Sequence, residues 1–175
     1  MKLILLHGPP AAGKYTTAKS ISEIVPAKIL HNHLIVDLSL SIYDDFGQAD
    51  FFDFNNKLRL LSIQKALDLG TVFLVMTYCY SFPQDNSYLK QIIQFCENNN
   101  IDLHPVHICP DEDILFQRVR DENRLCTNKV SDPHLLSELL KTHEYRAIEH
   151  KNTISFNNSD ISVSKLAAAI VGSFL

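Results

Sequence analysis

The residues with the clearest chemical purpose form one short segment near the start of the sequence. It reads GPPAAGKYT and directly follows the apolar run LILL. Its members are Gly8, Pro9, Pro10, Ala11, Ala12, Gly13, Lys14, Tyr15 and Thr16. The spacing GxxxxGK is typical of a phosphate-binding loop, in which a strand turns through glycines into a helix. Because the curved backbone and the helix dipole both favour an anion, we expect this loop to bind nucleotide phosphates.

Three side chains at the end of the loop predict how phosphates and a metal would be held. Lys14 stands at the position from which a lysine reaches the β- and γ-phosphates. Tyr15 stands where Ser or Thr normally ligates Mg²⁺, and its phenol is too long to occupy the same place. Thr16 keeps a hydroxyl one residue later, where a side chain usually touches the α-phosphate. The sequence therefore does not identify the metal ligands, and Thr16 and Asp37 are the candidates.

Composition bounds the class of protein. A chain of 175 residues that is 46% hydrophobic can bury one ample core, so we expect a single domain over residues 1–175. The net charge of −4 and the lack of a basic stripe argue against a nucleic-acid polymer as partner. No apolar run is long enough to span a membrane. The widely spaced cysteines predict reduced thiols and a cytoplasmic protein. They are Cys79, Cys96, Cys109 and Cys126.

Apolar runs alternate with helical patterns along the whole chain. The expected strands are Lys2–His7, Lys28–His31, Thr71–Tyr78, His104–Cys109 and Thr153–Asn157. The expected helices run roughly over Lys14–Val25, Asp53–Leu69, Asn86–Asn98, Pro110–Glu122, Asp132–Ile148 and Val163–Phe174. Short apolar strands separated by helices predict a parallel sheet covered on both faces, that is, a three-layer α/β domain. Ligands of such sheets bind at the carboxyl ends of the strands.

The second expected strand ends in His31-Asn32-His33, and Asp37 follows in the next turn. Imidazoles two positions apart on an extended chain point to the same side, so the two histidines could share a ligand. The alternative is a polar turn over the sheet edge. Further ligands at suitable spacing are lacking, so we do not expect a structural zinc site. Asp37 is a candidate carboxylate for Mg²⁺ or a substrate hydroxyl, with a solvated aspartate at a helix start as the alternative.

Two further residues are candidates for substrate binding. Arg59 could bind an anionic acceptor because its planar guanidinium pairs with carboxylate or phosphate through two hydrogen bonds, although a lone arginine is more often a surface charge. The third expected strand ends at Thr77-Tyr78, where a Walker B strand would end in an acid. Thr77 or Tyr78 could face the phosphates. The missing acid is a second reason to leave the metal site open.

The fourth expected helix ends in a cluster of arginines, RVRDENR. Arginines on a segment over the γ-phosphate can neutralise the charge that develops during phosphoryl transfer. A salt-bridged exposed helix is the alternative, because Asp121 and Glu122 lie among them. With the phosphate loop present, we favour a catalytic role for Arg118 and Arg124 on a small lid around residues 118–132.

Together these motifs resemble the shikimate-kinase-like small P-loop kinases. The resemblance rests on GPPAAGKYT, HNHLIVD, RVRDENR and NNSDIS, in that order, and covers essentially the whole chain. It implies a three-layer P-loop fold with a five-stranded parallel sheet in the order 2-3-1-4-5. It also implies lid arginines at Arg118 and Arg124, and a contact with adenine around Asn157 and Asn158. Arg59 matches the region where relatives place an acceptor-binding arginine.

The resemblance and the residues together predict a small-molecule kinase that uses ATP and Mg²⁺. Many relatives carry Asp-x-Asp where this chain has two histidines, so shikimate itself is not implied as the acceptor. The residues expected to bind the acceptor are His31, His33, Arg59 and Tyr78. Lys14 and the lid arginines would stabilise transferred charge, and Asp37 or a histidine could orient the acceptor. The alternative, favoured by Tyr15 and the missing acid, is a nucleotide-binding sensor or partner-binding protein without turnover; slow ATP hydrolysis is a weaker one.

Overall fold

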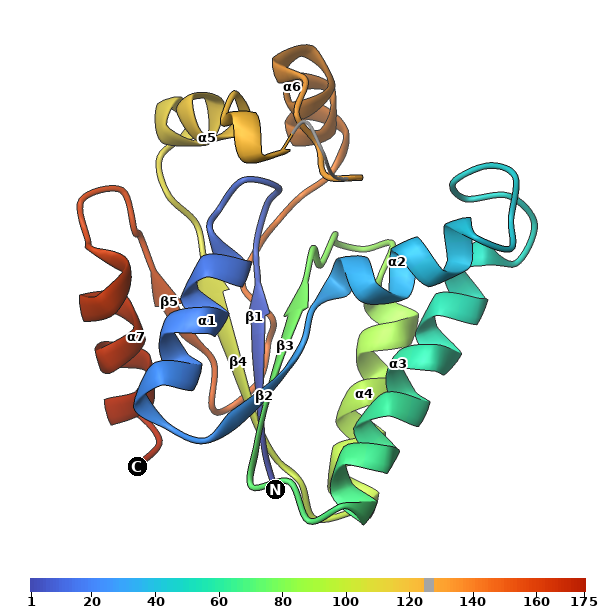
Figure 1. Ribbon diagram of the computed structural model, residues 1–175, viewed down its shortest axis with the longest axis vertical. Coiled ribbons are helices and arrows are strands. Elements are labelled where there is room, and N and C mark those ends of the chain that lie inside the picture. The colour runs from blue at the N-terminus through green and yellow to red at the C-terminus, as the bar shows by residue number, and fades with distance from the viewer. Residues whose placement is uncertain (125–127) are drawn as a thin grey trace.

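The computed structural model of the chain describes residues 1–124 and 128–175. Its strands form one sheet in which each strand runs parallel to its neighbours. They are β1 (Lys2–His7), β2 (Ala27–Leu30), β3 (Phe73–Tyr78), β4 (Asp102–Ile108) and β5 (Ile154–Phe156). The order across the sheet is β2-β3-β1-β4-β5 (Figure 1). The expected α/β class with a five-stranded parallel sheet in the order 2-3-1-4-5 is therefore confirmed.

Helices cover both faces of this sheet. The helices of the described residues are α1 (Lys14–Ile24), α2 (Asn32–Leu40), α3 (Phe51–Asp68), α4 (Asn86–Asn98), α5 (Glu112–Val119), α6 (Pro133–Thr142) and α7 (Val163–Gly172), with a short 3₁₀ turn at Glu122–Arg124. α1 and α7 lie on one face, and α3 and α4 on the other (Figure 1). α5 and α6 stand over the carboxyl ends of the strands, the edge at which ligands of parallel sheets bind.

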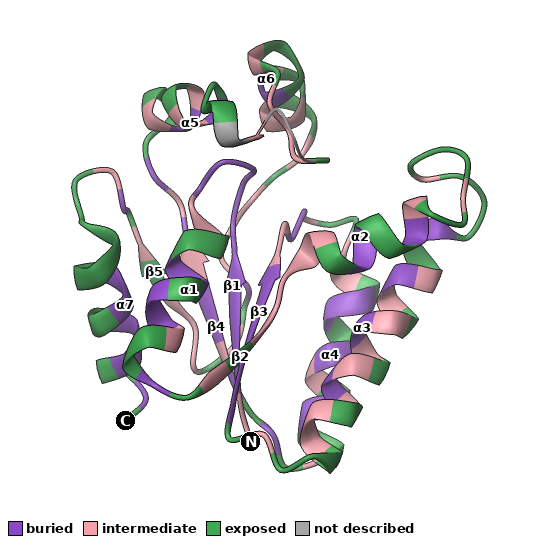
Figure 2. Ribbon diagram, in the orientation of Figure 1, coloured by how far each residue is buried: buried purple, intermediate pink, exposed green. Residues whose placement is uncertain are grey.

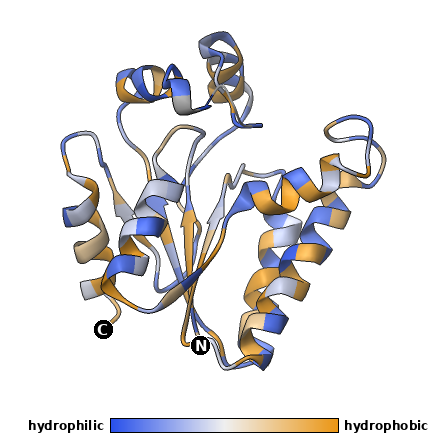
Figure 3. Cartoon of the chain, viewed as in Figure 1, coloured by the Kyte–Doolittle hydropathy of each residue, from blue (hydrophilic) through white to orange (hydrophobic). Residues whose placement is uncertain are grey.

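The central strand β1 explains why the sheet is covered on both sides. Leu3, Ile4, Leu5 and Leu6 are fully buried, and Figure 2 shows the central strands mostly in the purple of buried residues. Successive side chains of a strand point to opposite faces, so Ile4 and Leu6 join the core under α1 and α7 while Leu3 and Leu5 join the other core. Burying one such side chain stabilises the fold by about 1.5–3 kcal/mol relative to leaving it exposed. Toward their carboxyl ends the strands become more hydrophilic (Figure 3).

The segment after β2 differs from the expectation. The prediction that His31 and His33 lie on an extended chain is wrong, because α2 begins at Asn32. His31 caps this helix: its Nδ1 accepts the backbone N–H of His33 at 2.9 Å, a role that Ser, Thr, Asp and Asn usually fill. The two rings still lie near each other, with centroids 5.3 Å apart. Their proximity therefore comes from a helix start and not from strand alternation.

The helix expected over Asp132–Ile148 ends earlier. α6 ends at Thr142, and His143 has an extended backbone. The chain then runs antiparallel to the segment after β3, where Phe82 donates its N–H to the carbonyl oxygen of Glu144 at 2.9 Å. Ile148 is nevertheless buried, in the core under α3 and α4. Its helical spacing from the preceding leucines thus reflects burial and not a continued helix.

Three other expectations meet the structure only in part. No helix within the described ranges is long and apolar enough to cross a membrane. Cys79, Cys96 and Cys109 are free thiols, whereas Cys126 lies outside the described residues. The expected lid at 118–132 comprises the end of α5, the 3₁₀ turn and the approach to α6, and its residues 125–127 also lie outside the described ranges.

Candidate functional site

The phosphate-binding loop joins β1 to α1. Gly8, Ala11 and Gly13 have φ angles of 140°, 64° and 92°, in the left-handed region that favours glycine. A Cβ atom at Gly8 would lie 2.1 Å from the carbonyl oxygen of Ile108, so only glycine fits where the loop passes β4. This backbone shape is the one that turns successive N–H groups toward an anion.

Lys14, the first residue of α1, lies against this loop. Its Nζ donates to the carbonyl oxygens of Gly8 at 2.9 Å and Pro9 at 2.6 Å. A phosphate carries a full negative charge that a carbonyl oxygen lacks, so its attraction can draw the ammonium away from these carbonyls. The hydroxyls that follow are placed differently. Thr16 is exposed, and the Oγ1 of Thr17 donates to the loop carbonyl one helical turn earlier at 3.1 Å.

Two remote segments hold the loop through the carbonyl oxygen of Ala12. Arg118 on α5 donates to it from Nη1 at 3.3 Å, and Asn158 after β5 donates from Nδ2 at 3.0 Å. The Nη2 of Arg118 donates to the carbonyl oxygen of Asn158 at 3.0 Å. Burial lowers the pKa of the Arg118 guanidinium, so its charge gains from an anion beside it. The structure thus brings together the loop, one expected lid arginine and the expected adenine segment.

The segment after β5 holds a buried polar atom that lacks a described partner. Asn158 is 5% exposed, and its Oδ1 has no hydrogen-bond partner in the part of the chain that the structure describes. An unmet buried acceptor costs about 1–3 kcal/mol. Asn157 is used differently: its Nδ2 donates to Asp111 at 2.7 Å, and its Oδ1 accepts the N–H of Ser159 at 2.9 Å. Asn157 therefore holds the turn, while Asn158 faces the loop.

Three rings form a row at the start of α2. The centroids of Tyr15 and His31 are 4.0 Å apart, and those of His31 and His33 are 5.3 Å apart. Because Nδ1 of His31 accepts a backbone N–H, Nε2 carries the proton of its neutral ring. Burial, the largest cause, lowers the pKa of His31 to about 4 and also lowers the pKa of His33. Both imidazoles are therefore neutral near pH 7.

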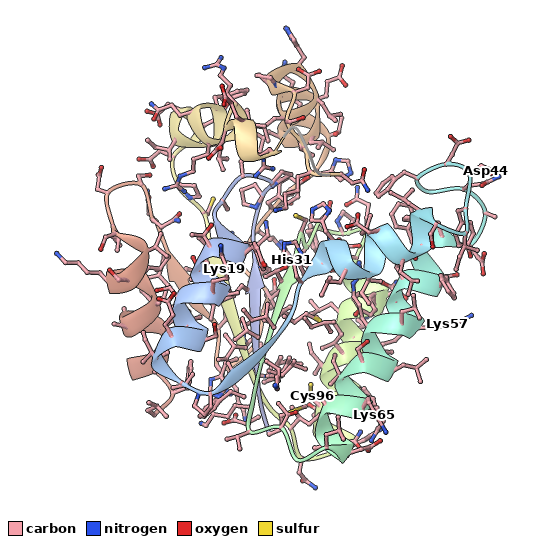
Figure 4. All side chains as sticks on the ribbon, viewed as in Figure 1. Lys19, His31, Asp44, Lys57, Lys65 and Cys96 are labelled. Carbon is pink, nitrogen blue, oxygen red and sulfur yellow. The ribbon has the colours of Figure 1, made fainter. Side chains whose placement is uncertain are left out.

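Two lysines outside the predicted site lie against Tyr15. The Nζ of Lys19 is 5.1 Å from the ring centroid, and the Nζ of Lys129 is 5.2 Å from it. Figure 4 labels Lys19 on α1 and His31 just before α2. Lys19 had a signal in the sequence, because residues four apart on a helix are neighbours. Lys129 had none, since it comes from the segment before α6.

Arg59 on α3 is held by protein partners. It is 5% exposed, and it donates from Nη1 to Asn56 at 2.9 Å and from Nη2 to Asn32 at 2.8 Å. Its guanidinium lies 5.1 Å from the ring centroid of Tyr78. Asn32 in turn donates its N–H to the hydroxyl of Thr77 at 3.0 Å. Arg59 therefore links α3 to the start of α2 and positions the two histidines.

Tyr78, the last residue of β3, is also engaged. Its hydroxyl donates to Oδ1 of Asp85 at 2.9 Å, and Oδ2 of Asp85 accepts the N–H of Ser81 at 2.7 Å. Burial raises the pKa of Asp85, and burial together with that carboxylate raises the pKa of Tyr78 well above its ordinary value. The phenol is therefore a fixed neutral donor and no base.

The residues around the loop do not form a magnesium site of the usual kind. Mg²⁺ takes oxygen ligands, commonly one or two carboxylates beside phosphate and water. Tyr15 replaces the hydroxyl ligand, and the hydroxyl of Thr77 already accepts a backbone N–H. Asp37 is exposed and accepts Nδ2 of Asn128 at 2.9 Å. No three His, Cys, Asp or Glu side chains are grouped around a metal position in residues 1–124 and 128–175. No described contact joins the candidate ligands Thr16 and Asp37.

Arg124 ends the 3₁₀ turn at the start of the expected lid. Its Nε donates to the carbonyl oxygen of Val130 at 2.7 Å, so it spans the segment in between. Burial is the largest cause that lowers its pKa. Of the two expected lid arginines, Arg118 thus meets the phosphate loop and Arg124 holds the lid segment together.

The comparisons with known proteins find solved structures only. No family model and no curated protein sequence matches the chain. A kinase candidate from Chloroflexus aurantiacus matches with a TM-score of 0.71 at 13% identity, over 99% of this chain and 98% of that chain. Shikimate kinase from Acinetobacter baumannii in complex with shikimate matches with a TM-score of 0.64 at 20% identity, over 98% of this chain and 91% of that chain. The APS kinase of Mycobacterium tuberculosis in complex with AMPPNP and APS matches with a TM-score of 0.64 at 13% identity, over 98% of this chain and 96% of that chain. The chain has the fold of these small P-loop kinases.

At these identities the likeness concerns the fold alone. It agrees with the position of the loop between the first strand and the first helix, at the carboxyl edge of the sheet. Two of these kinases hold different small molecules, shikimate in one and APS in the other. The fold therefore leaves the acceptor of this chain open.

Proposed function

We propose that the protein binds ATP on the loop from Gly8 to Thr16 and transfers its γ-phosphoryl group to a small-molecule acceptor. The observation that carries this proposal is the left-handed shape of the loop, with the ammonium of Lys14 against its carbonyl oxygens. A strand, loop and helix of this shape bind phosphate through backbone N–H groups. The likeness of the fold to kinases of small molecules supports transfer over binding alone.

Adenine is the base that we propose for the nucleotide. The unmet Oδ1 of Asn158 is a hydrogen-bond acceptor beside the loop. An acceptor suits the exocyclic amine of adenine, whereas guanine offers a carbonyl oxygen at the same ring position. Asn157 would support this contact by holding the turn against Asp111.

Positive charge for the transfer would come from Lys14, Arg118 and Arg124. Phosphoryl transfer through a loose transition state depends on positioning and on charge stabilisation more than on a strong base. Arg118 is already hydrogen-bonded to the loop, so its charge needs no large movement to meet a phosphate. We propose that residues 118–132 act as a lid on a single domain formed by residues 1–175.

The acceptor would bind beside His31 and His33 at the carboxyl edge of the sheet. The Nε2–H of neutral His31 can donate to an acceptor oxygen. The Nδ1 of His33 is buried and unmet by any described residue; burial lowers the pKa of that imidazole, and the charge of Asp37, one turn later on α2, partly opposes this shift. Asp37 or one of the histidines would orient the hydroxyl group of the acceptor. Arg59 and Tyr78 would act by positioning, since both terminal nitrogens of Arg59 and the hydroxyl of Tyr78 already have protein partners.

Mg²⁺ stays a sequence-based prediction for this site. The described residues do not form its usual set of ligands, so the transfer step is assigned to the chain's own cations and hydrogen-bond donors.

The second candidate is a nucleotide-binding protein without turnover. Tyr15 at the metal position and the end of β3 in Thr77-Tyr78 favour it, because both depart from the residues that kinases of this fold commonly use.

Titration calorimetry of ATP into the wild type and Lys14→Ala tests the binding. We expect Lys14→Ala to weaken the affinity for ATP by about tenfold or more, because charge-assisted hydrogen bonds to phosphate are lost. The control is Lys165→Ala, which removes an exposed ammonium from α7. Equal affinity of the wild type and Lys14→Ala, or no binding at millimolar ATP, would refute the proposal.

Transfer is then measured with ATP labelled in the γ-phosphate and with pools of hydroxylated and phosphorylated metabolites. A labelled product made by the wild type and not by Lys14→Ala supports the kinase. Binding that depends on Lys14, with no labelled product from any pool, supports the second candidate.

A further inference from the structure

An aromatic ring is held at the position that normally offers a hydroxyl to the metal. Tyr15 is 38% exposed and meets the ring of His31 at a centroid distance of 4.0 Å and an interplanar angle of 67°. A Ser or Thr ligand carries its oxygen directly on Cβ, whereas the phenol oxygen of Tyr15 lies beyond a whole ring. The ring therefore fills space between α1 and the start of α2 and leaves a metal without this ligand.

Two ammonium groups lie on this ring. The Nζ atoms of Lys19 and Lys129 are 5.1 Å and 5.2 Å from its centroid, within the roughly 6 Å over which an aromatic face attracts a cation. They approach from different parts of the fold, Lys19 from α1 (Figure 4) and Lys129 from the segment before α6. Lys14 is close enough that, like Lys129, it lowers the pKa of His31. Three lysines thus surround the beginning of α1.

These lysines have no paired carboxylate in the described ranges. The ion pairs found there join Lys2 and His104 to Asp102, and Arg146 to Glu149. Burial is the largest cause that lowers the pKa of Lys129, and the positive charges of Arg124 and Lys19 lower it further. Asp37 opposes this effect from a distance, while its own Oδ1 accepts a hydrogen bond from Asn128. A half-buried ammonium among like charges favours an anion as its ligand.

We infer that Lys129 and Lys19 supply the positive charge that a divalent metal supplies at the β- and γ-phosphates of other phosphate loops, so that ATP binds here without Mg²⁺. The inference rests on the proposed binding of ATP and deepens it. A lysine ammonium is a compact charge with three donors on a flexible stem, so it can follow phosphate oxygens. The same cations repel a metal ion at the place where Tyr15 denies it a ligand.

The test is calorimetric titration of ATP in excess EDTA and in excess Mg²⁺. We expect the affinity of the wild type to differ by less than about tenfold between the two buffers. Lys129→Gln, which keeps a long polar side chain, should weaken the affinity for ATP in EDTA by about tenfold or more. Lys19→Gln should weaken it in the same direction. Lys165→Gln is the matched control, and urea denaturation checks that each variant is folded.

A gain of more than about tenfold for the wild type on adding Mg²⁺ would overturn the inference. So would a folded Lys129→Gln that binds ATP in EDTA as tightly as the wild type. Lys14→Ala, titrated in both buffers, distinguishes failure of the proposed ATP binding from failure of the role of Lys129 and Lys19. If Lys14→Ala binds as the wild type does, the proposed function fails; if it does not bind and Lys129→Gln is unaffected, only the present inference fails.

Discussion

The imidazole of His7 stacks on that of His107, with ring centroids 5.1 Å apart and planes 24° apart. The two residues are register partners on the parallel strands β1 and β4. His107 donates from Nε2 to the carbonyl oxygen of Tyr145 at 2.9 Å. His7 is fully buried, and neither of its ring nitrogens meets a hydrogen-bond partner in the described residues. Burial, then His107 and Lys14, lower the pKa of His7 to about 3. A neutral ring thus lies directly before the phosphate loop.

This ring makes stability depend on pH. The pKa of His7 is about 3 in the folded chain and 6.5 in the unfolded chain. Between pH 3 and pH 6.5 the unfolded chain therefore binds a proton at this imidazole and the folded chain does not. The free energy of unfolding should therefore be level above about pH 7 and fall as the pH drops, by up to about 1.4 kcal/mol per pH unit for this group. His31, with a pKa lowered to about 4, acts in the same direction. Urea denaturation between about pH 4.5 and 8 measures this slope.

His7→Leu isolates the contribution of the buried ring. Leucine fits the apolar face of β1 that Leu3 and Leu5 share, and it carries no titrating group. We expect a shallower fall of stability with acid than in the wild type. His134→Gln, at an exposed position on α6, should leave the slope unchanged. An unaltered slope in His7→Leu would mean that other groups cause the dependence.

Gly8→Ala should damage both the fold and the site. The new Cβ would lie 2.1 Å from the carbonyl oxygen of Ile108, at a φ of 140° that an alanine avoids. We expect a loss of about 2 kcal/mol or more in the free energy of unfolding, together with weaker ATP binding. Gly172→Ala is the control, because nothing lies within 4 Å of its Cβ. It should be neutral or stabilise α7 by up to about 1 kcal/mol.

Arg118→Lys tests the link between α5, the loop and the segment after β5. A single ammonium cannot reproduce donation from two nitrogens to the carbonyl oxygens of Ala12 and Asn158. We expect a loss of about 1–2 kcal/mol in stability and a roughly tenfold weaker binding of ATP. Arg120→Lys, at an exposed position two residues later, should change neither quantity. Calorimetry and urea denaturation on the same samples decide the outcome.

Arg59→Lys separates a structural from a substrate-binding role. Because Arg59 is buried and bonded to Asn32 and Asn56, we expect the free energy of unfolding to fall by about 2 kcal/mol. Lys57→Ala, at an exposed position on the same helix, should have little effect. A stable Arg59→Lys with a raised KM for the acceptor would point instead to direct binding by the guanidinium.

Much of the architecture could be predicted from local patterns. The apolar runs and their helical neighbours located the strands and most helices to within about three residues, because burial and hydrogen bonding impose a periodicity that the sequence repeats. Two segments escaped this logic. α2 begins with a histidine as its cap, which is not among the usual capping residues. After Thr142 the chain leaves the helix for a partner, Phe82, that lies far away in the sequence.

The phosphate loop is the feature that the sequence determined by itself. Its glycines, its lysine and the tyrosine at the metal position lie within one short segment, and the bonds of Lys14 run within that segment. The tertiary structure alone decided which polar side chains reach the loop and which are bound elsewhere. Arg118 meets Ala12 across 106 positions and Arg59 meets Asn32 across 27, so no local pattern encodes these contacts. The meeting of Lys129 with Tyr15 has the same origin, because folding brings the segment before α6 to the start of α1.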